Sequence, residues 1–234
     1  MNASRVSRVG SIIPRLFGLL VGVAAVVSLL AGCFFVGDLD AEPTYAVVYE
    51  EEFDSPASYA GLNAWLIQES QTASVWVADG AIQIFIRAEE RFQMTRPLGI
   101  RTGNRFRLDV GACLVNGPVR AVLGVVFYLQ DNWDHIRFAI TKDGMMRLRR
   151  WTNSTWTSLT DWLPCPPINP GLDCNTITVV VDGSHFDFYV NETWVLEATD
   201  STYSSGGIGV AAAAQAGQTG THAAFPIVIL SEPI

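Results

Sequence analysis

The stretch YLQDNWDHIRFAITKDGMMRLRRW, residues 128–151, predicts two antiparallel strands joined by a tight turn. Apolar and polar side chains alternate along both halves, which is typical of strands with one buried face. The residues between them, Lys142-Asp143-Gly144, suit a turn because glycine readily adopts a left-handed backbone. This hairpin is the clearest β signal in the chain.

The turn also fixes a register, because the apolar side chains must share one face. We expect Arg137 opposite Arg149, His135 opposite Trp151, and Ala139 opposite Arg147. The loop at residues 131–134 would then place Tyr128 opposite Arg137 and Gln130 opposite His135, with Val125, Phe127 and Leu129 on the core side. Arg150 would also lie on the core side, at its edge. The polar face is our candidate binding patch: Tyr128, Gln130, His135, Arg137, Arg147, Arg149 and Trp151.

The residue types of this candidate patch suit sugar binding. Aromatic rings can stack on the C–H faces of pyranoses, and arginine forks bind vicinal hydroxyls or a carboxylate. Arg137 facing Arg149 is repulsive unless an acid or a bound anion lies between them. The alternative is an ordinary solvent face, because the polar side of an antiparallel sheet is commonly rich in arginine and threonine.

The rest of the chain after Val47 repeats the same pattern. Short apolar or alternating runs follow one another with turn signals between them, at a spacing of about ten residues that is typical of sandwiches and barrels. Asp79-Gly80 and Asp182-Gly183-Ser184 are further hairpin turns. We predict an all-β domain over residues 47–234, with neither a second domain nor a tandem repeat.

The order of several stretches resembles the concanavalin A-like lectins and glucanases, within them the laminin-G-like branch that includes 3-keto-disaccharide hydrolase-like domains. The resemblance covers roughly residues 47–230 and implies a two-sheet antiparallel jelly-roll sandwich with a concave face. Its pieces are folding signals rather than chemical ones. They are EEFDSPASYAGLNAW, ADGAIQI, GVVFYLQDNWDHIRFAITKDGMMRLRRWTNSTWTSLTDW, NTITVVVDGSHFDFYVNETWV and YSSGGIGVAAAA.

The N-terminus resembles the signal peptide of bacterial lipoproteins. Arg5, Arg8 and Arg15 precede the apolar run LFGLLVGVAAVVSLL, which is short for a membrane span, and LAGC ends it. The resemblance implies cleavage after residue 32 and lipidation of Cys33, with residues 33–46 as a tether. Acyl chains would hold the domain on the outer side of a membrane of the bacterial cell envelope, facing the periplasm or the exterior. The alternative is an uncleaved anchor helix with an incidental cysteine.

The charge balance excludes one class of partner. Three of the 15 basic residues precede Cys33, so the remainder carries 12 basic against 23 acidic residues. Because phosphate contacts need clustered cations, we do not expect nucleic-acid binding.

Catalytic and metal signals are weak. The Glu-x-Asp-x-x-Glu motif of related glucanases does not occur, and we find no other paired carboxylates that would serve a glycosidase. The resemblance also raises a structural calcium ion, for which Glu52 and Asp54 are weak candidates. However, Phe225-Pro226 stands where relatives tend to carry an acid. We therefore predict no catalytic residues, no cofactor and no metal site beyond this weak calcium possibility.

Three cysteines remain after Cys33. Cys165 and Cys174 end a proline-rich loop and could meet in a disulfide, which an extracytoplasmic location would favour. Cys113 lies in an apolar strand, where we expect a buried free thiol. Trp156 lies in the W…L…W segment after the hairpin, and we expect it in the core rather than at a ligand.

Two functions fit these patterns. The first is a membrane-anchored, non-catalytic recognition module that binds a glycan, possibly an acidic one, or a protein partner through one sheet face. The second is a sugar-active hydrolase of the 3-keto-disaccharide hydrolase-like type, which would need a carboxylate pair on that face. A purely structural role in the envelope is a third possibility.

Overall fold

The structure is a computed structural model that describes residues 43–55 and 63–234. Across these residues the regular structure is entirely β, with two antiparallel sheets and no helix. Accordingly, no helix within them is long and apolar enough to cross a membrane. The predicted all-β, two-sheet antiparallel sandwich is confirmed. The predicted signal peptide, Cys33 and most of the tether lie outside the described residues.

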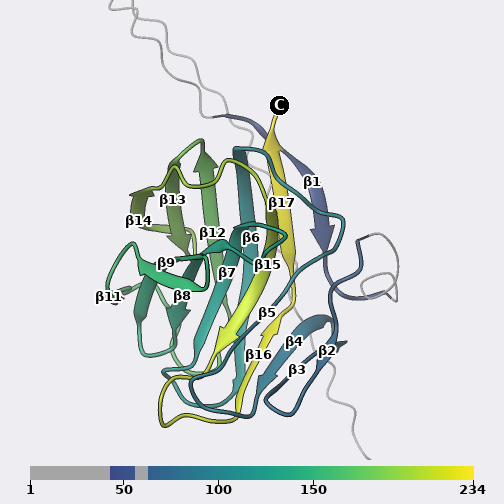
Figure 1. Ribbon diagram of the computed structural model, residues 1–234, viewed down its shortest axis with the longest axis vertical. Coiled ribbons are helices and arrows are strands. Elements are labelled where there is room, and N and C mark those ends of the chain that lie inside the picture. The colour runs from purple at the N-terminus through teal and green to yellow at the C-terminus, as the bar shows by residue number, and fades with distance from the viewer. Residues whose placement is uncertain (1–42, 56–62) are drawn as a thin grey trace, which may run out of the picture. The chain divides into compact units, whose positions relative to one another are not determined.

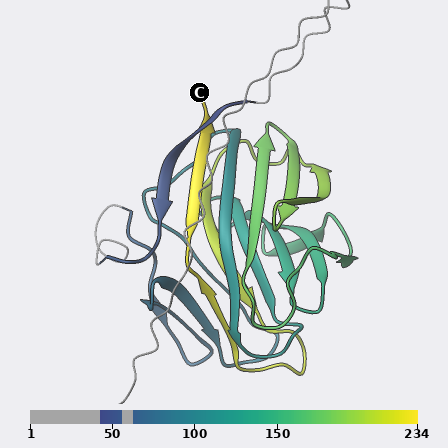
Figure 2. The ribbon, with the colours of Figure 1, turned by 180° about the vertical axis from the view of Figure 1, so that it is seen from behind.

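The larger sheet has the order β14-β13-β12-β6-β16-β4-β3-β2. In addition, β17 pairs with both β6 and β1, so β1 also belongs to this sheet. Figure 2 shows this sheet from behind, with the yellow β17 beside the teal β6. Its strands are β1 (Tyr45–Glu51), β2 (Gln68–Glu69), β3 (Ala73–Ala78), β4 (Ala81–Ile86), β6 (Arg105–Asn116), β12 (Asn175–Asp182), β13 (His185–Val190), β14 (Thr193–Thr199), β16 (Thr221–Phe225) and β17 (Val228–Pro233).

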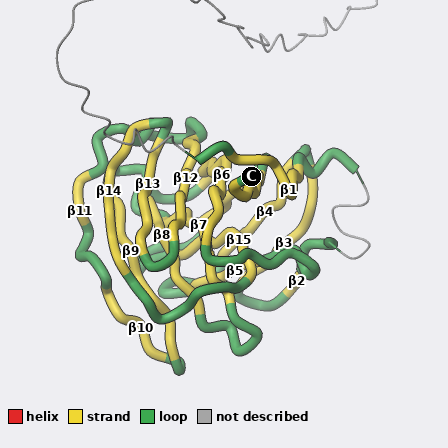
Figure 3. The backbone as a smooth tube through the Cα atoms, turned by 90° about the horizontal axis from the view of Figure 1, so that it is seen from above, coloured by secondary structure: helices red, strands yellow, loops and turns green. Residues whose placement is uncertain are grey.

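The smaller sheet has the order β10-β9-β8-β7-β15-β5, and β11 also pairs with β9. It lies in front of the larger sheet in Figure 1, and Figure 3 shows β8, β7 and β15 below β12 and β6. Its strands are β5 (Phe92–Thr95), β7 (Val122–Leu129), β8 (His135–Thr141), β9 (Met145–Thr152), β10 (Thr155–Ser158), β11 (Leu163–Pro164) and β15 (Gly207–Ala213).

The predicted turns are present. Gly144 has φ 87° between β8 and β9, and Gly183 has φ 65° between β12 and β13. Two further hairpins use residues other than glycine: Asn153-Ser154 and Asn191-Glu192 have positive φ at both positions. Two successive left-handed residues match the right-handed twist of the flanking strands, so these short loops close their hairpins tightly.

Aromatic side chains join the two sheets. Phe138 of β8 stacks on Phe188 of β13 with ring centroids 4.5 Å apart. Phe127 of β7 meets Phe186 of β13 edge to face at 5.2 Å. All four side chains are fully buried. Because aromatic rings bury the largest apolar areas, these contacts fix how the smaller sheet lies on the larger one.

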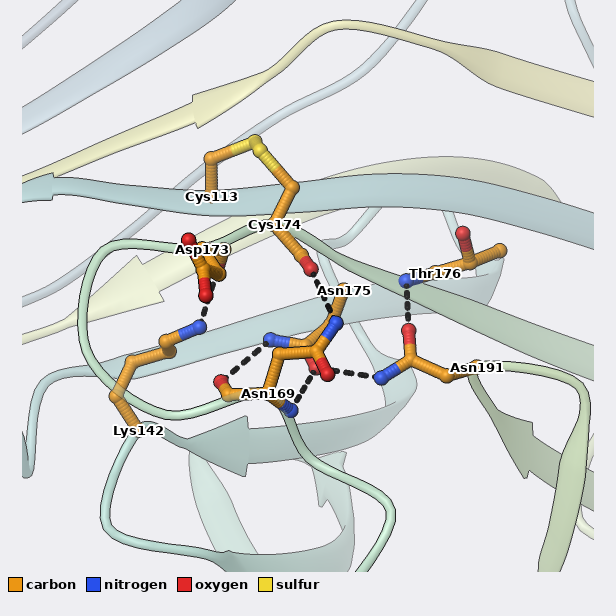
Figure 4. The surroundings of a disulfide bond; sticks show 8 residues. All are labelled: Cys113, Lys142, Asn169, Asp173, Cys174, Asn175, Thr176 and Asn191. Atoms are coloured by element: carbon orange, nitrogen blue, oxygen red, sulfur yellow. Dashed lines mark hydrogen bonds between the residues drawn. A yellow bond between two sulfur atoms is a disulfide. The ribbon is translucent and has the colours of Figure 1, made fainter.

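The disulfide differs from the prediction. Cys174 pairs with Cys113, and Cys165 is a buried free thiol. The strand register explains this, because Asn175 of β12 lies opposite Ala112 of β6 and brings the neighbouring Cys174 beside Cys113. Figure 4 shows the bridge between β6 and the segment leading into β12. Both predictions, a Cys165–Cys174 disulfide and a free Cys113, are therefore wrong.

A polar network surrounds the disulfide (Figure 4). Asn175 accepts a hydrogen bond from the backbone N–H of Asn169 at 2.7 Å and another from the Asn191 side chain at 2.8 Å. The Lys142 ammonium donates to the backbone carbonyl of Asp173. These bonds hold the proline-rich loop against the strands on both sides of it, so the loop is fixed by more than the covalent link.

Candidate functional site

The outer face of the smaller sheet carries most of the predicted patch. The register of β8 and β9 is the predicted one, with Arg137 opposite Arg149, His135 opposite Trp151, and Ala139 opposite Arg147. Ile136, Phe138 and Leu148 point into the core. The hairpin alone therefore brings His135, Arg137, Arg147, Arg149 and Trp151 to one surface.

Tyr128 and Gln130 do not belong to this surface. Val126, not Tyr128, lies opposite Arg137. Tyr128 has φ 51°, is fully buried in the core, and donates from its hydroxyl to the Gly183 carbonyl at 3.1 Å. Gln130 donates to the backbone carbonyls of Tyr128 and Ser205. Both placements in the patch are corrected.

A β-bulge in β7 is the reason that Tyr128 points away from the predicted patch. Leu129 and Val126, three residues apart, pair with Gly207 and Gly209, two residues apart, so β7 carries one extra residue. A bulge reverses the alternation of side chains beyond it. Tyr128 therefore turns inward, and Leu129, which we expected on the core side, packs with Val126 and Ala211 in a cluster separate from the main core.

Arg137 lies at the centre of the face, between two aromatic rings. Its guanidinium carbon lies 4.6 Å from the ring centroid of Phe92 and 4.5 Å from that of Trp156. The side chain is only 7% exposed. Since rings cover the flat sides of the guanidinium, its N–H donors are left free in the plane between them.

Two more arginines extend this arrangement. Arg149 contacts the same Trp156 ring at 4.6 Å, and Arg147 lies 5.6 Å from the ring of Trp162. Arg147 also donates to the Ser158 hydroxyl at 2.7 Å. Phe92, Arg137, Trp156 and Arg149 thus form an alternating series of rings and cations, and Arg147 lies beside Trp162. We call Arg137, Arg147 and Arg149 the arginine cluster.

The arginine cluster is electrostatically strained. Burial, together with Arg149 and Arg147, lowers the pKa of Arg137 to about 9. Burial and Arg147 lower the pKa of Arg149 as well. The Nε atoms of all three arginines are buried and have no partner within the described residues. Burying a cation without a counter-charge is unfavourable, so this cluster is built for something other than stability.

Phe92, Trp156 and Trp162 complete the site from other segments, and the hairpin pattern could not reveal them. Phe92 opens β5, Trp156 lies on β10, and Trp162 precedes β11. The expectation that Trp156 belongs to the core is wrong, because it stands on the outer face between Arg137 and Arg149. Pairing of β10 with β9 places Trp156 opposite Trp151, which brings it there.

Two hollows adjoin the aromatic stack. One, of about 290 Å³, is lined by the arginine cluster together with Glu90, Phe92, Trp156 and Trp162. The other, of about 350 Å³, is lined mostly by apolar and aromatic side chains, namely Phe92, Met94, Trp133, His135, Trp151 and Trp156. Because Phe92 and Trp156 line both, the two hollows form one groove with a cationic half and an aromatic half.

His135 supports the groove rather than acting in it. Its Nδ1 donates to the Trp133 carbonyl at 2.7 Å, and its ring stacks on Phe92 at 5.8 Å. Burial, with a contribution from Arg137, lowers the pKa of His135 to about 4. The ring is therefore neutral at pH 7 and is nearly inaccessible at 1% exposure.

Carboxylates are scarce at this groove. Among the residues that line the two hollows, Glu90 is the single acid. Asp109 and Asp187 lie on the larger sheet, where they bond Arg107 and His185. The described residues thus bring no second carboxylate to the groove walls beside Glu90.

One group could hold a metal ion elsewhere. His185, Asp187 and Glu197 on β13 and β14 have ligand atoms within 4.8 Å of one another. His185 already pairs with both acids, at 3.2 Å to Asp187 and 3.8 Å to Glu197. The weak calcium candidates Glu52 and Asp54 are exposed and do not belong to this group.

Solved structures with a similar fold share little sequence with the chain. The carbohydrate binding module CBM66 from Bacillus subtilis has a TM-score of 0.56 at 13% identity, covering 70% of this chain and 92% of its own. The β-glucanase of Bacillus licheniformis has 0.58 at 12%, covering 78% and 96%. The fold is therefore the concanavalin A-like jelly roll.

A third solved structure has a similar fold. The catalytic domain of an endo-1,3-β-glucanase from Thermotoga petrophila RKU-1 has a TM-score of 0.57 at 10% identity, covering 82% of this chain and 99% of its own. No protein-family model and no curated protein matches the sequence. At these identities the likeness concerns the fold alone, so function must be argued from the groove.

Proposed function

We propose that this protein is a carbohydrate-binding module that captures a glycan in the groove on the outer face of its smaller sheet. The arrangement of Trp156 between Arg137 and Arg149 carries the proposal. Aromatic walls and in-plane guanidinium donors are the two kinds of group that a sugar ring needs, one for its C–H face and one for its oxygens. The use of this fold by carbohydrate-binding proteins supports the proposal by analogy.

Binding suits the groove better than hydrolysis. Glycosidases of most families need two carboxylates, about 5–10 Å apart, on either side of the scissile bond. Glu90 is the one acid among the residues that line the hollows. A sugar-active hydrolase, our alternative function, lacks an observation that favours it in the described residues.

The proposal includes the location of the protein in the cell. Lipidation at Cys33 would hold the module on the outer side of a bacterial membrane, where glycans of the envelope or the surroundings are within reach. Tyr45 and Ala46 belong to β1, which shortens the expected tether. A tether of about a dozen residues, 33–44, would let the domain stand away from the lipid surface.

A glycan array tests the function. The full chain, purified in detergent, is applied beside the variants Trp156→Ala and Trp194→Ala. Trp194 is an exposed tryptophan of β14 in the larger sheet and serves as the matched control. We expect binding to one class of glycan, lost in Trp156→Ala and kept in Trp194→Ala. Absence of any glycan binding would reject the proposal and favour a protein partner for the groove.

A further inference from the structure

We infer that the ligand is an anionic glycan, and that the arginine cluster binds its carboxylate or sulfate group. This rests on the proposed function and specifies the class of sugar.

The described residues contain eleven arginines, and these divide by position. Six form ion pairs with acids: Arg87, Arg101, Arg105, Arg107, Arg120 and Arg150. The other five form none with a described residue; four line the groove and one lies beside it. Four of them line the cationic hollow, namely Arg91, Arg137, Arg147 and Arg149. The fifth, Arg96, stacks on Trp133 of the aromatic hollow at 5.2 Å.

A shortage of acidic residues does not explain why these five arginines form no ion pairs with described residues. Acidic residues outnumber basic ones, 23 to 15, so counter-charges are plentiful. Arg150, the immediate neighbour of Arg149 on β9, is paired with Asp200, which directly follows β14 of the larger sheet. An acid thus pairs with the neighbouring Arg150, whereas Glu90, the one acid that lines the groove, forms no ion pair with a described arginine of the cluster.

Burial makes the missing counter-charge costly. Arg137 is 7% exposed, lies opposite Arg149 in the strand register, and has an unpartnered buried Nε. Directly opposed like charges destabilise a sheet, and a buried unpaired cation does so more strongly. An anion that accepts hydrogen bonds from both Arg137 and Arg149 would relieve both costs at once.

The geometry of the donors sets the class of anion. Guanidinium groups present parallel N–H donors that match the two oxygens of a carboxylate or two oxygens of a sulfate ester. The neighbouring hollow, with Met94, Trp133 and Trp151, offers apolar surface, and Glu90 is the one acid in its lining. The groove as a whole fits an oligosaccharide with an anionic residue beside an uncharged sugar face.

The experiment compares each acidic oligosaccharide with its neutralised counterpart by titration calorimetry. The probes are tetragalacturonate, a hyaluronan tetrasaccharide and a chondroitin sulfate tetrasaccharide. Methyl esterification removes the carboxylate charge of the first two probes, and desulfation together with methyl esterification removes both kinds of charge from the third. Cellotetraose and laminaritetraose are neutral references. We expect an acidic probe to bind, and its neutralised form to bind at least about tenfold more weakly, because charge-assisted hydrogen bonds are lost.

Three arginine variants test which side chains bind the anionic group of the probe. Arg149→Gln, on a half-buried side chain, should weaken binding of the acidic probe about tenfold or more and reduce its preference over the neutral form. Arg137→Gln should do the same, with thermal unfolding recorded to confirm that it folds. Arg105→Gln removes an exposed arginine of the larger sheet and should leave affinity unchanged.

The outcomes separate the two proposals. Preference for the carboxylated or for the sulfated probe supports the inference and names the group. Equal binding of acidic and neutral forms, unaffected by Arg149→Gln, would overturn the inference while the carbohydrate-binding function stands. If no acidic or neutral probe binds and the array is also blank, both proposals fail.

Discussion

Arg137 on β8 lies directly opposite Arg149 on β9, and the indole ring of Trp156 contacts both guanidinium groups at about the same distance, 4.5 and 4.6 Å. Two facing cations on neighbouring strands repel each other. A shared aromatic ring reduces the cost, because the negative face of its π system attracts cations. Trp156 is therefore both a wall of the groove and the group that keeps the arginine cluster in place.

The first prediction concerns this double role of Trp156. Trp156→Ala should abolish glycan binding and also lower the free energy of unfolding by about 1–2 kcal/mol, because two cation–π contacts are lost. Chemical denaturation measures the stability and the glycan array measures the binding. Trp156→Phe keeps a ring and should recover most of the stability. Full binding by Trp156→Ala would show that the ring does not form part of the site.

The sequence predicted the β8–β9 hairpin well, because its turn and its alternation agree on one register. It therefore identified His135, Arg137, Arg147, Arg149 and Trp151 as one surface, and that surface exists. Local pattern was sufficient here, since both strands and their turn lie within 24 consecutive residues.

Non-local pairing limited the prediction elsewhere. Phe92 reaches the groove because β5 pairs with β15. Trp156 reaches it through the local β9–β10 hairpin, whose turn at Asn153-Ser154 contains no glycine. The partner of Cys174 depends likewise on the register of β12 against β6. The bulge at Tyr128 adds one residue to β7, and nothing in an alternating apolar run marks where such an insertion falls.

The bulge gives the second prediction. The backbone of Gly206 passes so close to Tyr128 that an added Cβ would lie 2.5 Å from the Tyr128 carbonyl carbon. Gly206→Ala should therefore lower the free energy of unfolding by about 1–3 kcal/mol, as overpacking does. Gly103→Ala is the control, because a Cβ there meets nothing within 4 Å. Equal stability of the two variants in urea would contradict the close approach.

The third prediction concerns the disulfide. Peptide mapping of the alkylated, non-reduced protein should find Cys113 linked to Cys174 and Cys165 alkylated only after unfolding, since Cys165 is 1% exposed. Cys174→Ser should lower the free energy of unfolding by about 2–4 kcal/mol. Cys165→Ala should keep the bridge. A peptide joining Cys165 to Cys174 would contradict the pairing.

The fourth prediction tests the lipid anchor. Protein expressed in bacteria with an alkyne-labelled fatty acid should carry the label and fractionate with membranes. Cys33→Ser should abolish both, because acylation in bacterial lipoproteins, which the LAGC segment resembles, occurs at this cysteine. The Cys165→Ala variant, which keeps Cys33, is the matched control. Retention of the label in Cys33→Ser would contradict lipidation at Cys33 and would leave the proposal of glycan binding in the groove unaffected.

The last prediction is a pH dependence that arises from His135. Its pKa in the folded protein, about 4, lies below the ordinary value of 6.5, mainly because burial disfavours the charged ring. The unfolded chain therefore takes up a proton between these two values and the folded protein does not. Stability due to the neutral ring is complete above pH 6.5, falls as the pH drops towards 4, and changes no further below that.

The loss at pH 4.5 should be about 2–3 kcal/mol relative to pH 7, following from the separation of the two pKa values. Urea denaturation at both pH values measures it. His135→Gln cannot take up a proton, so the difference between pH 7 and pH 4.5 should shrink by that amount, even if the variant is less stable at pH 7. An unchanged difference in His135→Gln would assign the acid sensitivity to other groups and would mean that folding does not lower the pKa of His135.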